Sequence, residues 1–383
     1  MSSQEDYSEI REAARRYARE KLLPGYTKRE RANVLERGIV RELGQLGFLG
    51  ADLPEQHGGL GVSGLAVGQI VEEIAYGDYS IANLPIQTSL MGTIIARNAT
   101  EETAKEWLAP MIGGEIITAI CLTEPRAGSD AANLGMRATR SGSDYILNGE
   151  KTSITFGAIA DMYIVFARTD PDGGARGVTA FVVPANAKGL SRTAFDDVGC
   201  RIIGRGSIFF DDVRVPEAYR LGGENQGFTK VMSGFDYSRA LIALMAIGCA
   251  QASLDEAWAY TTQREAFGAP IAQYQGVTFP LAEQETYLAA ARQLSYHTLE
   301  LRDQGKPHTA EAAMVKWFGP KTAFDAMHQA LLTYGHYGYS LDSPHQQRMR
   351  DVLGHEIGDG MAGIMKLIIA RERVGRAAVQ YKK

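Results

Sequence analysis

The spacing of apolar residues changes twice along this chain, and the order of those changes limits the folds open to it. From residue 5 to about 114 apolar residues recur every three or four positions, as in amphipathic helices. From 117 to 216 short β-rich runs alternate with turn signals, and after Gly222 the helical spacing returns. We therefore expect an α+β protein ordered as a helical bundle, an antiparallel β domain and a second helical bundle.

The β-rich stretch contains five runs of β-branched and aromatic residues, expected as strands at 118–122, 144–147, 162–167, 178–183 and 207–210. Asn148-Gly149 and Asp172-Gly173-Gly174 are typical turn sequences between them. Such spacing favours a small antiparallel sheet system, either barrel-like or a sandwich.

The last third contains four long helical patterns, at 234–263, 275–305, 309–334 and 361–381. Pro320 is expected to kink or interrupt the third of them. A chain of 383 residues is long enough for two to three domains. We place them at 1–116 (N-terminal helical), 117–222 (middle β) and 223–383 (C-terminal helical).

Composition excludes several classes of protein. Forty Lys and Arg against forty-five Asp and Glu give a mild net charge of −5, so neither a nucleic-acid partner nor an anionic membrane surface is expected. Cys121, Cys200 and Cys249 have no metal-ligand spacing and are expected to be reduced, buried thiols, so no metal site is predicted. The N-terminus lacks the apolar core of a signal peptide, and the most apolar run, 240–250, is shorter than a membrane span. These features favour a cytoplasmic protein.

Five segments together carry a resemblance. They read LTEPRAGSD at 122–130, NGEKTSIT at 148–155, FDDVRVP at 210–216, REAFG with a following Gln at 264–275, and RD with LIIARE within 350–372. In this order they resemble the flavin-dependent acyl-CoA dehydrogenase family over essentially the whole chain.

The resemblance implies a reaction and its partners. A base removes a proton from the α carbon of an acyl-CoA thioester, and the β hydrogen passes as hydride to N5 of FAD. Such chemistry requires an electrophilic flavin, a polarised thioester carbonyl and a positioned base. It further implies an electron-transfer flavoprotein as electron acceptor and a homotetramer, or at least a dimer.

Three residues are implied near the flavin. Thr123 and Thr155 match family positions whose hydroxyls face the flavin ring, although a strand Thr by itself is an ordinary β-former. Ser129 lies in a small-residue loop that the family places near the CoA and flavin phosphates, so it is expected to contact both cofactor and substrate. Taken alone, the loop would be a plain turn.

The far end of FAD is expected to be held by a neighbouring subunit. Arg264, Phe267 and Gln275 match the positions that bind its adenosine-diphosphate end, and the forked guanidinium of Arg suits a pyrophosphate. Taken one at a time, an Arg on the surface and a Phe in the core are each common in proteins. Four residues that often help to hold the adenine in relatives are replaced here, by Leu332, His336, Met361 and Gly363.

The resemblance places the catalytic base at Asp359. The family most often has a Glu at this position, before the closing helix, and its alternative base location falls at Ser238. An Asp between Gly358 and Gly360 would by default be a turn residue. Because Asp is one methylene shorter than Glu, the loop or the substrate must shift to keep the base within reach. Gly360 is expected beside the substrate.

The acyl group is expected to be bulky. Ser153 and Gly358 replace large aromatic residues, which leaves room for a branched or ring-shaped acyl group, such as a cyclohexane-carboxylate thioester, unless another side chain fills the space. For CoA, Asp236 and Arg239 match the helix that meets the nucleotide. Asp236 is equally explained as a helix N-cap.

Two other functions stay open at this point. Nitroalkane oxidases resemble the family and use an aspartate at the corresponding place, so the chain could be a flavin-dependent oxidase. It could also be a catalytically silent binding relative, since a fold does not fix a function. Thr123, Thr155, Arg264 and Asp359 together argue against a silent relative.

Overall fold

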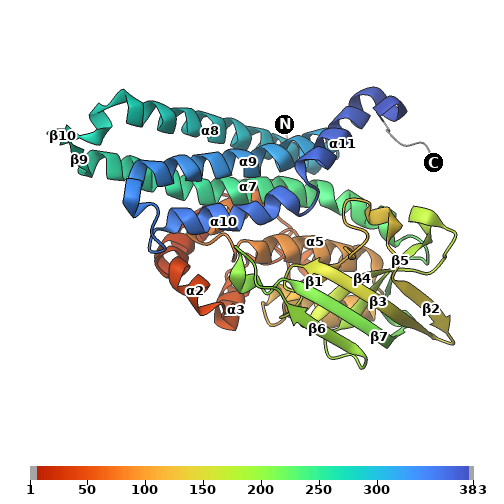
Figure 1. Cartoon of the computed structure of the whole chain (residues 1–383). Helices are drawn as coiled ribbons and strands as arrows, with labels where there is room; N and C mark the ends of the chain where they lie inside the picture. The colour runs from red at the N-terminus through yellow and green to blue at the C-terminus, as the bar shows by residue number, and fades with distance from the viewer. Residues whose placement is uncertain (1–6, 379–383) are drawn as a thin grey trace.

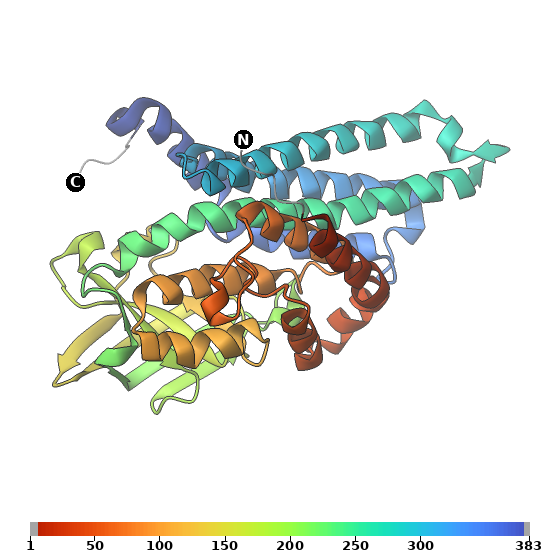
Figure 2. The same cartoon turned by 180° about the vertical axis from the view of Figure 1, so that it is seen from behind.

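The computed structural model describes residues 7–378, except for the side chains of 228–233 and 376. The long C-terminal helices lie side by side along one side of the molecule, with the sheet beneath one end of them (Figure 1). The view from behind shows the N-terminal helices against both the bundle and the sheet (Figure 2). The expected order of helical bundle, β domain and helical bundle is confirmed, while the residue bounds that we gave the three domains stay a prediction.

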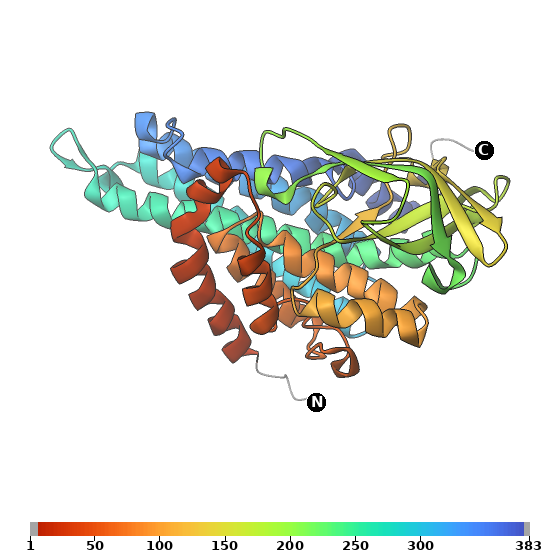
Figure 3. The ribbon, with the colours of Figure 1, turned by 90° about the horizontal axis from the view of Figure 1, so that it is seen from below.

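From residue 7 onward, the N-terminal part contains six α-helices: α1 (Ser8–Tyr17), α2 (Tyr26–Ala32), α3 (Arg37–Gln45), α4 (Gly64–Gly77), α5 (Asn83–Asn98) and α6 (Glu101–Ile112). Two of them begin with a side-chain cap. The Ser63 hydroxyl accepts the backbone N–H of Ala66 at 3.3 Å, and Thr100 that of Thr103 at 3.2 Å. Seen from below, this part lies beneath the long helices and beside the sheet (Figure 3).

Eight strands build one sheet: β1 (Thr118–Cys121), β2 (Arg137–Ser141), β3 (Asp144–Ile154), β4 (Met162–Arg168), β5 (Val178–Pro184), β6 (Leu190–Ala194), β7 (Gly206–Pro216) and β8 (Arg220–Leu221). Their order is β6-β7-β3-β2-β4-β5-β8, with β1 also beside β4. Most pairs are antiparallel, as expected, and β1 and β2 in addition run parallel to β4. The β2–β3 hairpin separates β1 from β4 in sequence, so no tight turn joins these two strands.

Up to residue 378, five α-helices follow: α7 (Gly227–Gln263), α8 (Gln275–Asp303), α9 (Thr309–Tyr334), α10 (Pro344–Ile357) and α11 (Ala362–Val374). The short strands β9 (Glu265–Ala266) and β10 (Ala269–Pro270) form a hairpin between α7 and α8. Helix α9 continues through Pro320, so the expected interruption does not occur. Helix α9 packs on α7, α8, α10 and α11, and these contacts hold its backbone helical despite the missing hydrogen bond.

Helix α7 is the apolar centre of the fold. By length and composition its segment Gly234–Gln263 could cross a membrane, but 83% of the most apolar window is buried inside the protein. It contacts α4, α5, α8 and α9. Its apolar side chains are therefore used in packing between the helices.

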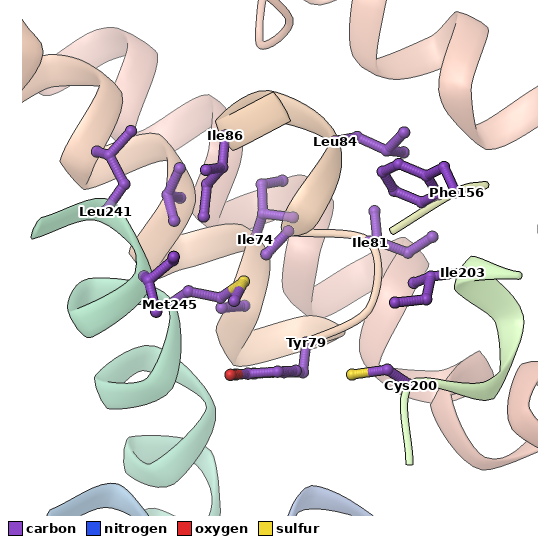
Figure 4. Packing of buried hydrophobic residues seen from close by; sticks show 14 of the residues in the cluster. Ile74, Tyr79, Ile81, Leu84, Ile86, Phe156, Cys200, Ile203, Leu241 and Met245 are labelled. Carbon is purple, nitrogen blue, oxygen red and sulfur yellow. The ribbon is translucent and has the colours of Figure 1, made fainter. Parts of the chain in front are cut away.

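One continuous core joins all three parts. Ile74 of α4, Phe156 and Ile203 of the middle part, and Leu241 and Met245 of α7 belong to the same cluster and are nearly inaccessible to solvent. Figure 4 shows these side chains meeting from α4, from α7 and from two stretches of the middle part. The position of the sheet relative to the helices is thus fixed by shared packing.

Asp351 is a buried polar residue that links separate parts of the chain within this core. Its Oδ2 accepts the Tyr26 hydroxyl at 2.5 Å, and its Oδ1 accepts the backbone N–H of Cys200 at 2.5 Å. Burial raises the pKa of Asp351 to about 7. The N-terminal helices, the middle part and α10 therefore meet at one carboxyl group.

Close helix packing depends on small residues. A Cβ added at Gly248 of α7 would lie 2.1 Å from the backbone oxygen of Glu72 in α4. A Cβ at Gly319 of α9 would lie 2.8 Å from the Cβ of Ala243. Larger residues at either place would force the backbones apart.

We predict that Gly248→Ala destabilises the protein by about 1–3 kcal/mol, because α7 and α4 must separate to admit the methyl group. Its melting temperature should fall by several degrees in a thermal scan. Gly38→Ala is the matched control, since nothing lies within 4 Å of a Cβ at that exposed helical position. It should leave the melting temperature unchanged or slightly raised, and equal effects of the two substitutions would contradict the packing argument.

Candidate active site

The loop between α10 and α11 turns sharply around Asp359. Asp359 has φ 53° and Gly360 has φ 101°, both in the left-handed region. Asp tolerates this conformation better than most side chains, and glycine adopts it freely. A Cβ at Gly360 would also lie 2.3 Å from Cε of Met365. This turn directs the Asp359 carboxylate toward α7.

On α7 the nearest hydrogen-bonding partner of the carboxylate is Ser238. Its Oγ lies 3.4 Å from Oδ2 of Asp359 and also donates to the backbone oxygen of Phe235 at 3.2 Å. The two base locations that the resemblance offered are therefore neighbours in space. With Ser at one of them, Asp359 is the carboxylate that remains.

The surroundings tune the acidity of Asp359. Burial raises the pKa of Asp359, while the positive charges of Lys316 and Arg239 and the hydrogen bond from Ser238 oppose the rise. A carboxylate whose pKa is raised toward the working pH accepts a proton more readily than an exposed one. The arrangement is suited to a general base.

Lys316 of α9 was not singled out by the sequence. Its Nζ donates to the backbone oxygen of His355 at 2.6 Å and to that of Gly360 at 3.2 Å. Burial lowers the pKa of Lys316 to about 8, against the opposing charge of Asp359. The sequence signal for a buried Lys was its place within an apolar helical run. A single Lys in such a run is also typical of an exposed position.

The two threonines expected at the flavin ring lie at neighbouring strand ends. Thr123 follows β1 and Thr155 follows β3, and the backbone N–H of Thr152 donates to the oxygen of Thr123 at 2.9 Å. Both are half-buried. Neither hydroxyl has a hydrogen-bond partner within residues 7–378, apart from the side chains that the structure leaves out, so both are free to bind a ligand.

A buried ion pair fixes these strand ends. The fully buried Lys151 places its Nζ 2.7 Å from Oε1 of Glu124 and donates to the oxygen of Leu122 at 3.1 Å. Glu124 also accepts the backbone N–H of Gly135 at 2.6 Å and of Met136 at 2.9 Å. Burial lowers the pKa of Lys151, and the charge of Glu124 opposes that fall. Both residues lie in segments that resemble the family, but no local sequence pattern predicts their pairing.

Ser129 lies on the exposed part of the next loop. Nothing lies within 4 Å of a Cβ added at Gly128, so the backbone there is open to a ligand. Among the described residues, no hydrogen bond or ion pair joins Ser129 to Asp359. Its expected role near the phosphates stays a prediction.

Asp236 and Arg239 form a pair on α7. Arg239 Nη1 lies 2.8 Å from Asp236 Oδ1, and the Thr309 hydroxyl donates to Asp236 Oδ2 at 2.6 Å. Because α7 already begins at Gly227, Asp236 lies inside the helix and the N-cap interpretation is wrong. Arg239 Nε is buried without a partner among the described residues.

Arg264, Phe267 and Gln275 lie far from the two threonines. All three are exposed, at or beside the β9–β10 hairpin, and Phe267 is 98% exposed. Figure 1 shows that hairpin at the end of the bundle opposite the sheet. A single chain does not bring these residues together with Thr123 and Thr155.

The positions expected to leave room for the acyl group are open. Ser153 and Gly358 are both exposed. A Cβ at Gly358 would lie 3.2 Å from the backbone oxygen of Gly354, and no closer atom is present in the part of the chain that the structure describes. Leu332 and Met361, two of the residues that stand in place of those that often hold the adenine in relatives, are also exposed.

Comparison with known families covers nearly the whole chain. Residues 4–115 match the model of the acyl-CoA dehydrogenase N-terminal domain, 119–213 that of the middle domain and 225–373 that of the C-terminal domain. The chain belongs to the acyl-CoA dehydrogenase family.

Individual relatives agree with this assignment. A 3-(aryl)acrylate reductase of Clostridium sporogenes (strain ATCC 15579) is 36% identical over 372 residues, which cover 96% of this chain and 98% of the relative. The butyryl-CoA dehydrogenase structure from Megasphaera elsdenii has a TM-score of 0.93 at 32% identity, covering 98% of this chain and 99% of that one. A glutaryl-CoA dehydrogenase from Mycobacterium smegmatis in complex with FADH2 has a TM-score of 0.92 at 28% identity, covering 98% and 96%.

We predict that Lys151→Met destabilises this acyl-CoA dehydrogenase by about 3–5 kcal/mol, because it leaves the carboxylate of Glu124 buried without its partner. The double variant Lys151→Met with Glu124→Gln should be more stable than the single one, because the charge is then absent and the amide oxygen still accepts a backbone N–H. Thermal unfolding measures both.

The control for that experiment is Lys105→Met, which breaks an exposed pair with Glu101 and should change nothing. Additive losses in the double variant would contradict the pairing.

Proposed function

We propose that this acyl-CoA dehydrogenase performs the FAD-dependent α,β-dehydrogenation of an acyl-CoA thioester with Asp359 as the base. The observation that carries the proposal is the Asp359 carboxylate in its left-handed turn, partly buried and facing Ser238 between the charges of Arg239 and Lys316. The family membership supports the reaction, and Asp359 lies at the position where the family most often has a Glu.

The residues present fit FAD. The hydroxyls of Thr123 and Thr155 lie at adjoining strand ends with no partner in the described part of the chain. They can hydrogen-bond the edge of an isoalloxazine ring, which presents alternating donors and acceptors. When bound, FAD supplies the hydride acceptor.

The chain's own residues would handle the proton. Asp359 takes the α proton of the thioester, and Ser238 orients the carboxylate from α7. The positive charges of Arg239 and Lys316 limit the rise in the pKa of Asp359 and so favour its ionised form. The proposed contacts with CoA and substrate are Ser129, Asp236, Arg239 and Gly360.

The second half of the cofactor site would come from another subunit. Phe267 is 98% exposed at the hairpin between α7 and α8, so its ring is available for a contact with another chain. With Arg264 and Gln275 beside it, the hairpin is suited to hold the diphosphate end of a neighbour's FAD. We infer a homotetramer, since reciprocal contacts of this kind close with symmetry.

The substrate we propose carries a ring. The small residues Ser153 and Gly358 are exposed, and one relative is named a 3-(aryl)acrylate reductase. An alicyclic or aryl-bearing acyl-CoA therefore fits better than a straight chain. Electron-transfer flavoprotein as the acceptor, and a cytoplasmic location, stay predictions.

The decisive experiment is an anaerobic screen of linear, branched, alicyclic and aryl-bearing acyl-CoA thioesters for bleaching of the flavin. Asp359→Asn should reduce flavin at a rate lower by about two to four orders of magnitude while still binding the thioester, because the amide cannot accept the proton. Glu356→Gln, on the last turn of α10, is the matched control and should keep the wild-type rate. The reverse result would assign the base to Glu356.

The raised pKa of Asp359 predicts the pH dependence of that step. The rate of flavin reduction should rise with pH as the carboxylate loses its proton. This rise, the acid limb of the pH profile, should occur at a higher pH than for an exposed Asp. Stopped-flow measurements across pH would show this limb. Its persistence in Asp359→Asn would point to another titrating group.

We expect Arg264→Ala to lose FAD while the chain keeps its fold, because the charge facing the diphosphate is removed. The flavin-to-protein absorbance ratio and light scattering measure cofactor content and assembly. A wild-type protein that is monomeric yet holds FAD tightly would contradict the shared site.

A further inference from the structure

Lys316 lies in an unfavourable place for an ammonium group. The residue is 0% exposed on α9. A buried charge is costly unless hydrogen bonds compensate for the lost water. Its two acceptors are the backbone oxygens of His355 and Gly360, at 2.6 and 3.2 Å.

These two acceptors lie on either side of Asp359. His355 belongs to the last turn of α10, where backbone carbonyls lack partners within the helix, and Gly360 directly follows the carboxylate. One ammonium group therefore joins the end of the helix to the exit of the loop. A positive charge is also favourable at a helix C-terminus.

The ring of His355 is fixed from the other side. The Tyr79 hydroxyl lies 2.9 Å from Nδ1 of His355, and the two rings pack edge to face with centroids 5.6 Å apart. Burial and the charge of Lys316 lower the pKa of His355 to about 3, so the ring is neutral at ordinary pH. The start of the loop is thus held by both α9 and the N-terminal part.

We propose that Lys316 is a positioning residue whose two hydrogen bonds hold the loop that directs the Asp359 carboxylate at the substrate. The inference rests on the proposed function, in which Asp359 is the base. The ionisable groups facing Lys316 are Asp359 in the loop, Glu356 and the neutral His355 on α10, and Arg239 on α7. The two carboxylates face two positive groups, the Lys316 ammonium and the Arg239 guanidinium, across this junction.

The test uses the FAD-loaded enzyme and the thioester that bleaches it fastest. Lys316→Met should lower the rate of flavin reduction by about 10²-fold, because a small displacement of the base is costly, while the Kd of the thioester stays at its wild-type value. The acid limb of the rate should move to higher pH, because the charge that lowers the pKa of Asp359 is gone.

Two variants complete the series. Lys321→Met is the matched control, since Lys321 lies on the same helix but is exposed and pairs with Asp325. It should match wild type in rate and acid limb. Lys316→Gln, which keeps a donor but no charge, replaces Lys316→Met under the same criteria if the latter does not fold. A wild-type rate and an unmoved acid limb in the Lys316 variant would overturn the proposal.

A second readout needs no turnover. Amide hydrogen exchange of residues 356–362 should be at least about tenfold faster in the Lys316 variant, with no change over α4, where local opening is independent of the loop. Unchanged exchange in the loop would overturn the inference even in an active enzyme. If instead no thioester bleaches the wild type, the dehydrogenase assignment fails, and exchange still decides whether Lys316 holds the loop.

Discussion

Burial of α7 governs the arrangement of everything around it. Residues 240–247 are each no more than 2% exposed, so the helix is apolar around its whole circumference and must be covered on all sides. The N-terminal helices, α8 and α9 supply that cover. Ser238 and Arg239 come directly before the buried stretch. The buried stretch of α7 that follows them therefore sets the positions of these two groups, which face Asp359.

Polar groups inside this core hold the functional segments in place. Glu124 with Lys151 ties two strand ends together, Asp351 joins three parts of the chain, and Lys316 bridges the loop around Asp359. Each such contact is stabilising only when complete, because a buried charge or donor left alone is costly. Buried polar contacts of this kind give the site a single geometry where apolar packing alone would tolerate several.

The spacing of apolar residues predicted those helices and strands whose own sequence contains a clear helical or alternating pattern. Helix α9 begins and ends at the expected 309 and 334, since its period is unbroken. Strands β2 and β6 were missed because their side chains are almost all accessible, which removes the alternating pattern. In the site, family motifs gave Asp359 and Thr155 as candidates. The contacts of Lys316 join residues about forty positions apart, and no local pattern records them.

The exposed hairpin around Phe267 would have a thermodynamic consequence as half of a shared cofactor site. If each FAD is shared between two chains, cofactor binding and assembly are linked, and each must strengthen the other by the same factor. The apoprotein would then dissociate at concentrations where the loaded enzyme stays assembled, and dilution would release cofactor. The amount of active enzyme in a cell would depend on the supply of flavin as well as on the amount of protein.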